Sequence, residues 1–198
     1  RRKLENNVDA KLLKYAEAME LTASRANDLL INLLFWTRIQ TSNVTPSKIE
    51  LNLTDEIESI LELTQFAATQ KSITIVHNYP KECMIYADKN MISLIIRNLI
   101  SNAIKFTPHE GCITISASIN RNKMEFLVSD TGYGIPKEQL ANLFSPDNVF
   151  HTSGTNKERG TGLGLKLCSE FVQLHNGEIT VTSEINEGTT FKVVLPLG

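Results

Sequence analysis

Two asparagines and a lysine share one face of a predicted helix near the middle of the chain. In the segment RNLISNAIKFT, residues 97–107, Asn98, Asn102 and Lys105 follow one another at spacings of four and three residues. Side chains at these spacings lie on the same side of a helix. A helix that only fills a core has little use for two amides on one stripe, so the pattern indicates a polar ligand against this face.

Two glycine-rich segments could hold such a ligand. DTGYGI, residues 130–135, directly follows a predicted strand, and GTGLGL, residues 160–165, opens a predicted helix. Glycine lets the backbone approach a ligand closely or adopt positive φ. At the start of a helix the free N–H groups and the positive end of the dipole attract anions, most often phosphate. About 25 residues without a clear pattern separate the segments, as in a functional lid or a disordered loop.

Each of these signals is weak alone. A single G-x-G is more often an ordinary turn, and Asp130, taken alone, is a turn residue at the end of a strand. GTGLG matches neither the dinucleotide fingerprint G-x-G-x-x-G nor the phosphate loop G-x-x-x-x-G-K-[ST]. Together, a polar helix face, a carboxylate beside G-x-G and a glycine-rich helix start form the parts of a nucleotide site.

The elements that must position these residues alternate between hairpin strands and helices. Asp88 is a good N-cap for a helix over 89–106, which Pro108 and Gly111 end. A helix over 53–71, with Thr54 as its N-cap and Phe66 on its apolar side, precedes it. We predict strands at 73–77, 83–87, 112–119, 124–130, 178–183 and 190–196, and helices at 137–143 and 163–176. This order predicts an α+β two-layer sandwich, a mixed and mainly antiparallel sheet with helices on one face.

A heptad pattern precedes this domain and predicts one long bundle-forming helix over residues 12–39. Its apolar positions follow steps of four and three residues: Leu12, Ala16, Met19, Ala23, Ala26, Leu30 and Leu33. A core helix of the following domain is the alternative, but the unbroken 3.5-residue period favours a bundle. We therefore divide the chain into a partial helical hairpin at 1–42, a linker at 43–52 and a main domain at 53–198.

Composition excludes several classes of protein. The 198 residues carry a net charge of −2, so nucleic acid is not an expected partner. The three cysteines (Cys83, Cys112, Cys168) suit buried reduced thiols better than a metal or disulfide framework. No apolar run approaches the roughly 18 residues of a membrane span, so we expect no direct membrane contact. The chain begins without methionine, and we interpret it as a piece of a longer protein.

The motifs, in this order, resemble those of the ATP-binding domain of bacterial sensor histidine kinases. The wider group includes DNA gyrase, a heat-shock chaperone ATPase and the MutL repair ATPases. NLISNAIKFT resembles the N box, DTGYGI the first glycine box, LANLF the F box and GTGLGL the second glycine box. The resemblance extends over about 150 residues, from about Ser47 to Leu197.

This resemblance implies ATP and Mg²⁺ as ligands and a role for each matching residue. Asn102 would hold Mg²⁺ through its amide oxygen, which suits an ion that keeps waters and phosphates as its other ligands. Asn98 would lie near the metal or the phosphates, and Lys105 would act as a point charge on them. Asp130 would accept from the adenine amine. Gly132 and Gly134 would leave room for the base, and Phe144 would pack beneath the lid unless it is an ordinary core aromatic. The phosphates would be wrapped by Gly160, Thr161, Gly162, Leu163 and Gly164, with Lys157 and Arg159 as lid cations.

Asn98 separates the kinases from the hydrolases of the group. The hydrolases have a glutamate at this place, which activates water, whereas an amide cannot remove a proton at neutral pH. The resemblance therefore favours transfer of phosphate to a protein nucleophile. A nucleotide-binding regulatory module without transfer activity remains the alternative.

The acceptor histidine of such kinases is missing from this sequence. None of the four histidines (His77, His109, His151, His175) resembles the H-[DE]-[LI]-[RK]-x-P motif, so we assign no catalytic residue and expect no autophosphorylation. The resemblance implies a homodimer through the helix bundle, and a response-regulator receiver domain as partner. It also implies a cytoplasmic location, as the cytoplasmic portion of a bacterial receptor.

Overall fold

The computed structural model describes residues 44–145 and 162–197, together with residues 15, 19, 30, 33–35 and 37. The chain divides into two compact units, Arg1–Val44 and Thr45–Gly198. Most of the predicted bundle helix, 12–39, lies outside the described residues, and those of its residues that are described are helical. No helix in the described parts of either unit is long and apolar enough to cross a membrane.

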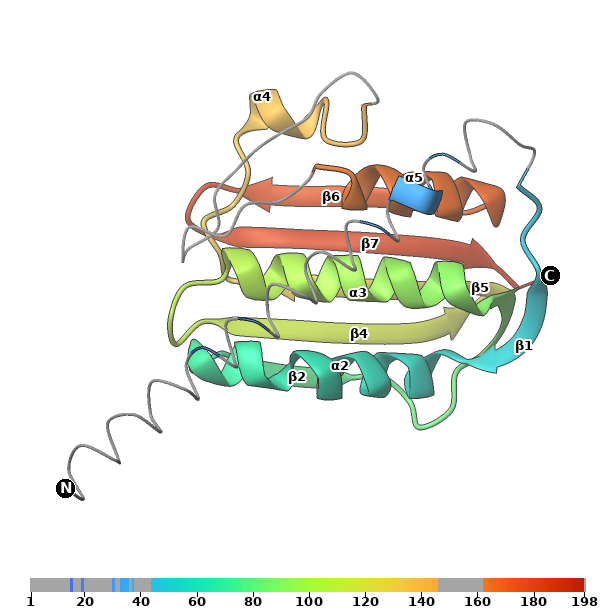
Figure 1. The fold of residues 1–198 in the computed structure, drawn as a ribbon, viewed down its shortest axis with the longest axis horizontal. Helices are drawn as coiled ribbons and strands as arrows, with labels where there is room; N and C mark the ends of the chain where they lie inside the picture. The colour runs from blue at the N-terminus through green and yellow to red at the C-terminus, as the bar shows by residue number, and fades with distance from the viewer. Residues whose placement is uncertain are drawn as a thin grey trace. The chain divides into compact units, whose positions relative to one another are not determined.

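A five-stranded sheet forms one layer of the second unit (Figure 1). Its order is β2-β4-β5-β7-β6; β2 runs parallel to β4, and the other neighbours are antiparallel. The mixed, mainly antiparallel sheet that the sequence predicts is therefore confirmed. The strands are β2 (Thr74–Asn78), β4 (Cys112–Asn120), β5 (Lys123–Asp130), β6 (Glu178–Glu184) and β7 (Gly188–Pro196).

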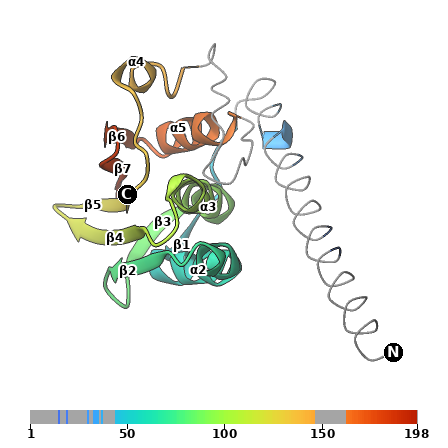
Figure 2. The ribbon, with the colours of Figure 1, turned by 90° about the vertical axis from the view of Figure 1, so that its left-hand side faces the viewer.

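Three helices cover one face of this sheet, as Figure 2 shows. They are α2 (Leu53–Gln70), α3 (Lys89–Phe106) and α5 (Gly164–Leu174). The short helix α4 (Lys137–Leu140) contacts β6. The core lies between the layers, where α3 buries nine side chains and the inward residues of β4, β5 and β7 are all but inaccessible. This arrangement confirms the two-layer α+β sandwich.

A second, two-stranded sheet leads into the N-terminal ends of α2 and α3. β1 (Lys48–Asn52) pairs antiparallel with β3 (Met84–Asp88), so that Lys48 lies opposite Asp88. The sequence predicts a linker over 43–52, and the structure places a strand in its second half. KIELN alternates apolar and polar residues too briefly for its sequence alone to identify a strand.

The start of α2 differs from the prediction. Asn52, and not Thr54, is the N-cap: its side-chain oxygen accepts from the main-chain N–H of Thr54 at 3.2 Å. The Thr54 hydroxyl instead donates to the carbonyl of Pro80, at 2.9 Å. Phe66, predicted on the apolar side, is 62% exposed, whereas Ile57 is fully buried. The buried stripe of α2 is thus narrower than its apolar content suggests.

Candidate nucleotide site

The helix that carries the polar stripe is held at its first turn by two side chains. Asp88 caps α3 as predicted: its Oδ1 accepts from the Met91 N–H at 3.2 Å, and its Oδ2 accepts from the Ser47 N–H at 2.9 Å. The main-chain N–H of Asp88 donates to Nε2 of His175, 3.0 Å away at the end of α5. Burial lowers the pKa of His175, so the neutral ring that this bond requires is the favoured form.

The last turn of α3 is held by a buried lysine. The Lys71 ammonium donates to the main-chain carbonyls of Ile104 at 2.8 Å and Lys105 at 3.0 Å. Helix ends leave such carbonyls without partners, and a cation there is favoured by the dipole. The hydroxyl of Thr107 donates to the carbonyl of Ala103 at 2.7 Å. Both ends of α3 are therefore fixed by residues distant in sequence as well as local ones.

The predicted stripe lies between these ends and is half-buried. Asn98, Asn102 and Lys105 are neither fully buried nor fully exposed. The Lys105 ammonium lies 4.6 Å from the ring centroid of Phe106, a distance typical of a cation–π contact. Partial burial suits groups that meet a ligand, because a partly desolvated charge or amide interacts more strongly than one in water.

The carboxyl of Asp130 lies at the end of β5, beside the first glycine segment. Its Oδ1 accepts from the main-chain N–H of Gly132 at 2.8 Å. Burial raises the pKa of Asp130 from 3.8 to about 6, while hydrogen bonds from the Gly132 and Thr189 main chain act in the opposite direction. Backbone donors thus hold this half-buried carboxylate in place at the end of β5.

The two glycines of the first segment are required by the protein's own packing. A Cβ at position 132 would lie 2.6 Å from Oδ1 of Asp130 and 2.6 Å from the carbonyl oxygen of Phe106. Gly134 has a φ of +70°, and a Cβ there would overlap with the carbonyl oxygen of Glu184. These contacts show close approach of the backbone to α3 and to the end of β6. That the two glycines leave room for a base stays a prediction.

The second glycine segment contacts the polar stripe directly. The Asn98 side chain donates from Nδ2 to the carbonyl of Gly164 over 3.5 Å. A Cβ at position 164 would come within 2.6 Å of the Asn98 Oδ1. Leu163 is the N-cap residue of α5, and no side-chain hydrogen bond from the described residues caps this helix. The start of a helix favours anions through its N–H groups and the positive end of its dipole.

The structure brings part of the predicted set together around α3. Asn98 touches the second glycine segment, and the carbonyl of Phe106 touches the first. Asn102 and Lys105 lie on the same face of α3, between Asn98 and Phe106 along the helix. Phe144 is half-buried in the turn after α4. Four predicted lid residues, Lys157, Arg159, Gly160 and Thr161, lie outside the described residues.

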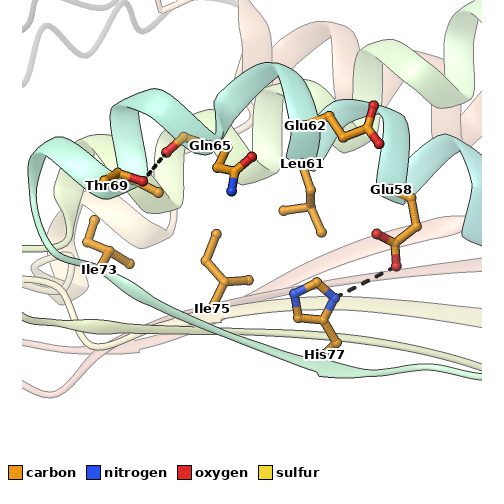
Figure 3. A pocket seen from close by; sticks show the side chains of 9 residues that line it. Glu58, Leu61, Glu62, Gln65, Thr69, Ile73, Ile75 and His77 are labelled. Carbon is orange, nitrogen blue, oxygen red and sulfur yellow. Dashed lines mark hydrogen bonds and ion pairs between the residues drawn. The ribbon is translucent and has the colours of Figure 1, made fainter.

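A separate hollow of about 320 Å³ lies between α2 and β2, away from the predicted residues (Figure 3). Leu61, Ile73 and Ile75 point into it. At one end His77 lies 3.8 Å from a carboxyl oxygen of Glu58. None of the residues predicted to bind the nucleotide lines this pocket. The pocket is therefore separate from the predicted nucleotide site.

Two residues that hold the site were not expected from the sequence: Lys71 and His175. Each is buried, and each acts on α3 from another helix or its flanking turn. The sequence places Lys71 and His175 at the ends of amphipathic helices, where basic residues are common. Only the spatial pairing, across 33 residues for Lys71 and 87 for His175, identifies their partners.

The sequence pattern of one protein family matches residues 87–198; this family is described as histidine kinase-, DNA gyrase B-, and HSP90-like ATPase. The adaptive-response sensory kinase SasA of Synechocystis sp. is 35% identical over 150 residues, which cover 74% of this chain and 38% of that protein. The histidine protein kinase DivJ of Caulobacter vibrioides is 31% identical over 187 residues, covering 93% and 31%. The chain thus spans less than two fifths of the length of these curated relatives.

Solved structures of similar fold include the catalytic domain of the histidine kinase ThkA, in a nucleotide-free form. It superposes with a TM-score of 0.67 at 29% identity, covering 76% of this chain and 96% of that domain. ThkA in complex with the response regulator protein TrrA gives a TM-score of 0.71 at 22% identity and covers 89% of this chain and 49% of that one. At 22% identity, the similarity to ThkA in that complex shows the fold alone.

Proposed function

We propose a function for a chain that belongs to the histidine kinase-, DNA gyrase B- and HSP90-like ATPase family, and that contains the ATP-binding catalytic domain of a sensor histidine kinase. Its substrate is ATP bound with Mg²⁺, and its reaction transfers the γ-phosphoryl group to a histidine of an acceptor helix. From that histidine the phosphoryl group passes to an aspartate of a receiver domain. The observation that supports this best is the convergence of Asn98, Asp130 and both glycine segments on α3.

Asp130 and Asn102 divide recognition of the two ends of the nucleotide. The Asp130 carboxylate, oriented by the N–H of Gly132, accepts from the exocyclic amine of adenine and so discriminates against guanine, which has an oxygen there. The half-buried amide of Asn102 offers one neutral oxygen, which fits Mg²⁺ because this ion keeps waters and phosphate oxygens as its other ligands. When bound, the ion would neutralise charge on the phosphates.

Lys105 and the start of α5 complete the phosphate end. The Lys105 ammonium, on the face of α3 that also carries Asn102, supplies a point charge, and the N–H groups of the first turn of α5 supply donors. In the transfer step the histidine Nε2 forms a P–N bond while the bond from the γ-phosphorus to its bridging oxygen breaks and ADP leaves. Positioning and charge neutralisation carry most of the catalysis in such a reaction.

The partner and the location follow from the family in the same way. ThkA, a structural neighbour, forms a complex with a response regulator protein, which supports a receiver domain as the partner of this chain. We propose that the intact protein is a homodimer through its helix bundle, that this region is cytoplasmic, and that the chain alone does not phosphorylate itself. Its described histidines support the last point: His77 lies in β2, His109 follows α3, and His175 is buried and bonded to Asp88.

Two measurements test this function. Binding of ATP is measured with and without Mg²⁺, and transfer of radiolabelled phosphate is measured to a separately supplied acceptor hairpin carrying an H-box histidine. Asn102→Ala should abolish most of the Mg²⁺-dependent part of ATP affinity, and Asp130→Asn should reduce the preference for ATP over GTP. Binding without any transfer to the hairpin would favour the regulatory module, and rapid release of free phosphate would favour a hydrolase. Acid-labile label on this chain itself would contradict the absence of autophosphorylation.

A further inference from the structure

The turn between β6 and β7 packs against the first glycine segment, residues 130–135. The main-chain N–H of Asn186 in this turn donates to the carbonyl of Tyr133 at 2.9 Å. Gly188, the first residue of β7, has a φ of +117°, and a Cβ there would overlap with the carbonyl oxygen of Asp130. The segment that begins with Asp130 is therefore supported by backbone from a distant part of the chain.

One hydroxyl, that of Ser183 near the end of β6, connects the two ends of this segment. Its oxygen accepts from the main-chain N–H of Ile135, the last residue of the segment, at 2.8 Å. Its hydrogen is donated to the carbonyl of Gly188 at 2.8 Å, and Gly188 is the residue that packs against Asp130. Ser183 thus reaches the last residue of the segment directly and the first by way of Gly188.

The hydrogen bonds of Ser183 use every site that a hydroxyl has. Thr189 lies opposite Ser183 in the register of β6 and β7, and the two hydroxyl oxygens are 2.9 Å apart. A serine hydroxyl has one donor hydrogen and two acceptor lone pairs. With its hydrogen on the carbonyl of Gly188, it accepts from both Ile135 and Thr189. A half-buried hydroxyl with all its sites occupied keeps one orientation, which suits a group that fixes its neighbours.

We propose that Ser183 is a positioning residue for the base end of the nucleotide site, because it fixes the first glycine segment on the sheet. The register supports this: Asp130 pairs with Thr189, and Thr189 pairs with Ser183. Directly paired residues share a face, so these three side chains form one row across β5, β7 and β6. Ser183 acts through the segment whose Gly132 N–H holds the Asp130 carboxyl. This inference rests on the proposed function, since it concerns the same ATP site.

The preference for adenine over guanine tests the proposal, because Asp130 provides that preference in the proposed function. Wild type, Ser183→Ala, Asp130→Asn and the double variant are each titrated calorimetrically with Mg-ADP and with Mg-GDP, which bind without turnover. Loss of the hydroxyl that fixes the segment should lower the ratio of the ADP to the GDP affinity about three- to tenfold in Ser183→Ala. In the Asp130→Asn background the same substitution should change the ratio less than about 1.5-fold, because the discriminating carboxylate is absent.

Thr190→Val is the matched control. Thr190 also forms a hydroxyl hydrogen bond between two strands, to Ser129 at 2.9 Å, but it follows Thr189 in β7 and so lies on the opposite face of the sheet. This variant should keep the affinity ratio within about 1.5-fold of wild type. Ser183→Thr keeps the hydroxyl and suits a strand, so it should stay within about twofold. Ser183→Cys, with a thiol that is a weak donor and acceptor, should lower the ratio as alanine does and replaces the alanine variant if that one does not fold.

Hydrogen exchange of backbone amides in the free protein gives a readout independent of nucleotide. The N–H of Ile135 loses its acceptor in Ser183→Ala, so its exchange rate should rise about tenfold. The decisive amide is that of Gly132, which donates to the Asp130 carboxyl. Its exchange rate should rise about threefold or more in Ser183→Ala and stay at the wild-type value in Thr190→Val.

Several outcomes overturn the proposal. An unchanged affinity ratio in Ser183→Ala, or an equal fall in Thr190→Val, means that Ser183 has no specific effect on the base end. An equal fall in the Asp130→Asn background means that Ser183 does not act through Asp130. An unchanged exchange rate of Gly132 in Ser183→Ala means that the effect does not reach the carboxyl. If the wild type binds neither nucleotide, the proposed function fails instead, while the exchange of Gly132 still decides whether Ser183 positions the segment.

Discussion

Acidification should weaken nucleotide binding through a single carboxyl, that of Asp130. In the free protein, burial raises its pKa to about 6. The exocyclic amine of adenine is a donor, so it pairs with the ionised carboxylate and not with the hydroxyl of the protonated form. Binding and protonation therefore compete for the same oxygen atoms, and the competition begins within one pH unit of neutrality.

The magnitude follows from linkage. When only the ionised form binds, the apparent Kd is multiplied by one plus ten to the power of (pKa − pH). With a pKa of about 6, this factor is about 1.1 at pH 7, about 2 at pH 6 and about 11 at pH 5. The last value corresponds to about 1.4 kcal/mol of binding free energy. Acidification has the opposite effect on the free energy of unfolding. Because the pKa of Asp130 is raised in the folded protein, protonation of Asp130 adds stability as the pH falls from about 6 towards 3.8.

The assay is calorimetric titration with ADP in excess Mg²⁺ at several pH values from 5 to 8, on wild type and on Asp130→Asn. The phosphates of the nucleotide also take up protons in this range, but both proteins share that contribution. The ratio of the two dissociation constants therefore isolates Asp130. The advantage of the wild type should shrink by about tenfold from pH 8 to pH 5. A constant ratio across this range, or an advantage that grows with acid, would refute the assignment of Asp130 as an acceptor with a raised pKa.

Three further changes test contacts around α3. Lys71→Met leaves helix-end carbonyls without their buried cation and should cost about 2 kcal/mol in urea unfolding. Lys89→Met removes an ion pair with Glu56 in which the lysine side chain is 59% exposed, and it should cost less than about 1 kcal/mol; equal losses would contradict the capping role of Lys71. The folded pKa of His175 is lowered, so its contribution to stability is complete above about pH 6.5 and is lost as the pH falls; His175→Gln should remove that part of the acid sensitivity, seen as a flatter dependence of the melting temperature on pH. Asn98→Glu should lose about fivefold or more in Mg-ADP affinity without gaining steady-state ATP hydrolysis, since the carboxylate would lie against Gly164; a gain in phosphate release would show that residue 98 alone separates kinase from hydrolase.

Where local chemistry decides the structure, the sequence predicted it well. The bounds of α3 agree at both ends with those expected, because Asp88 caps its first turn and Pro108 follows its last. The strands β4 and β5 agree within one residue, since each alternates in the manner of a half-buried strand. The polar stripe on α3 was visible because its side chains conflict with a purely apolar face.

Where contacts between distant segments decide the structure, the sequence alone did not predict it. The strand β1 exists because β3 lies beside it, and five residues of weak alternation do not reveal a partner. Asn52 caps α2 partly because its oxygen also accepts from the N–H of Cys83, at 2.9 Å. Phe66 was placed inside by its type alone, although its helix face lies away from the sheet. These errors have one cause: the competing groups come from elsewhere in the chain.

Position 98, at which the resemblance distinguishes kinases from hydrolases, shows why the sequence and the structure are both needed. From the sequence, Asn98 favours phosphate transfer over hydrolysis because an amide is no base. The contact with Gly164 adds that the amide is a donor to α5 and not only a group that lacks a negative charge. The two explanations differ for a substitution that keeps the donor and changes its reach. Asn98→Gln cannot remove a proton either, so if basicity were the whole reason it would be harmless. A longer amide, however, cannot reach the Gly164 carbonyl with the same geometry from this backbone position, and we expect it to weaken Mg-ADP binding as Asn98→Ala does. Affinity equal to that of the wild type would leave the missing base as the sufficient explanation.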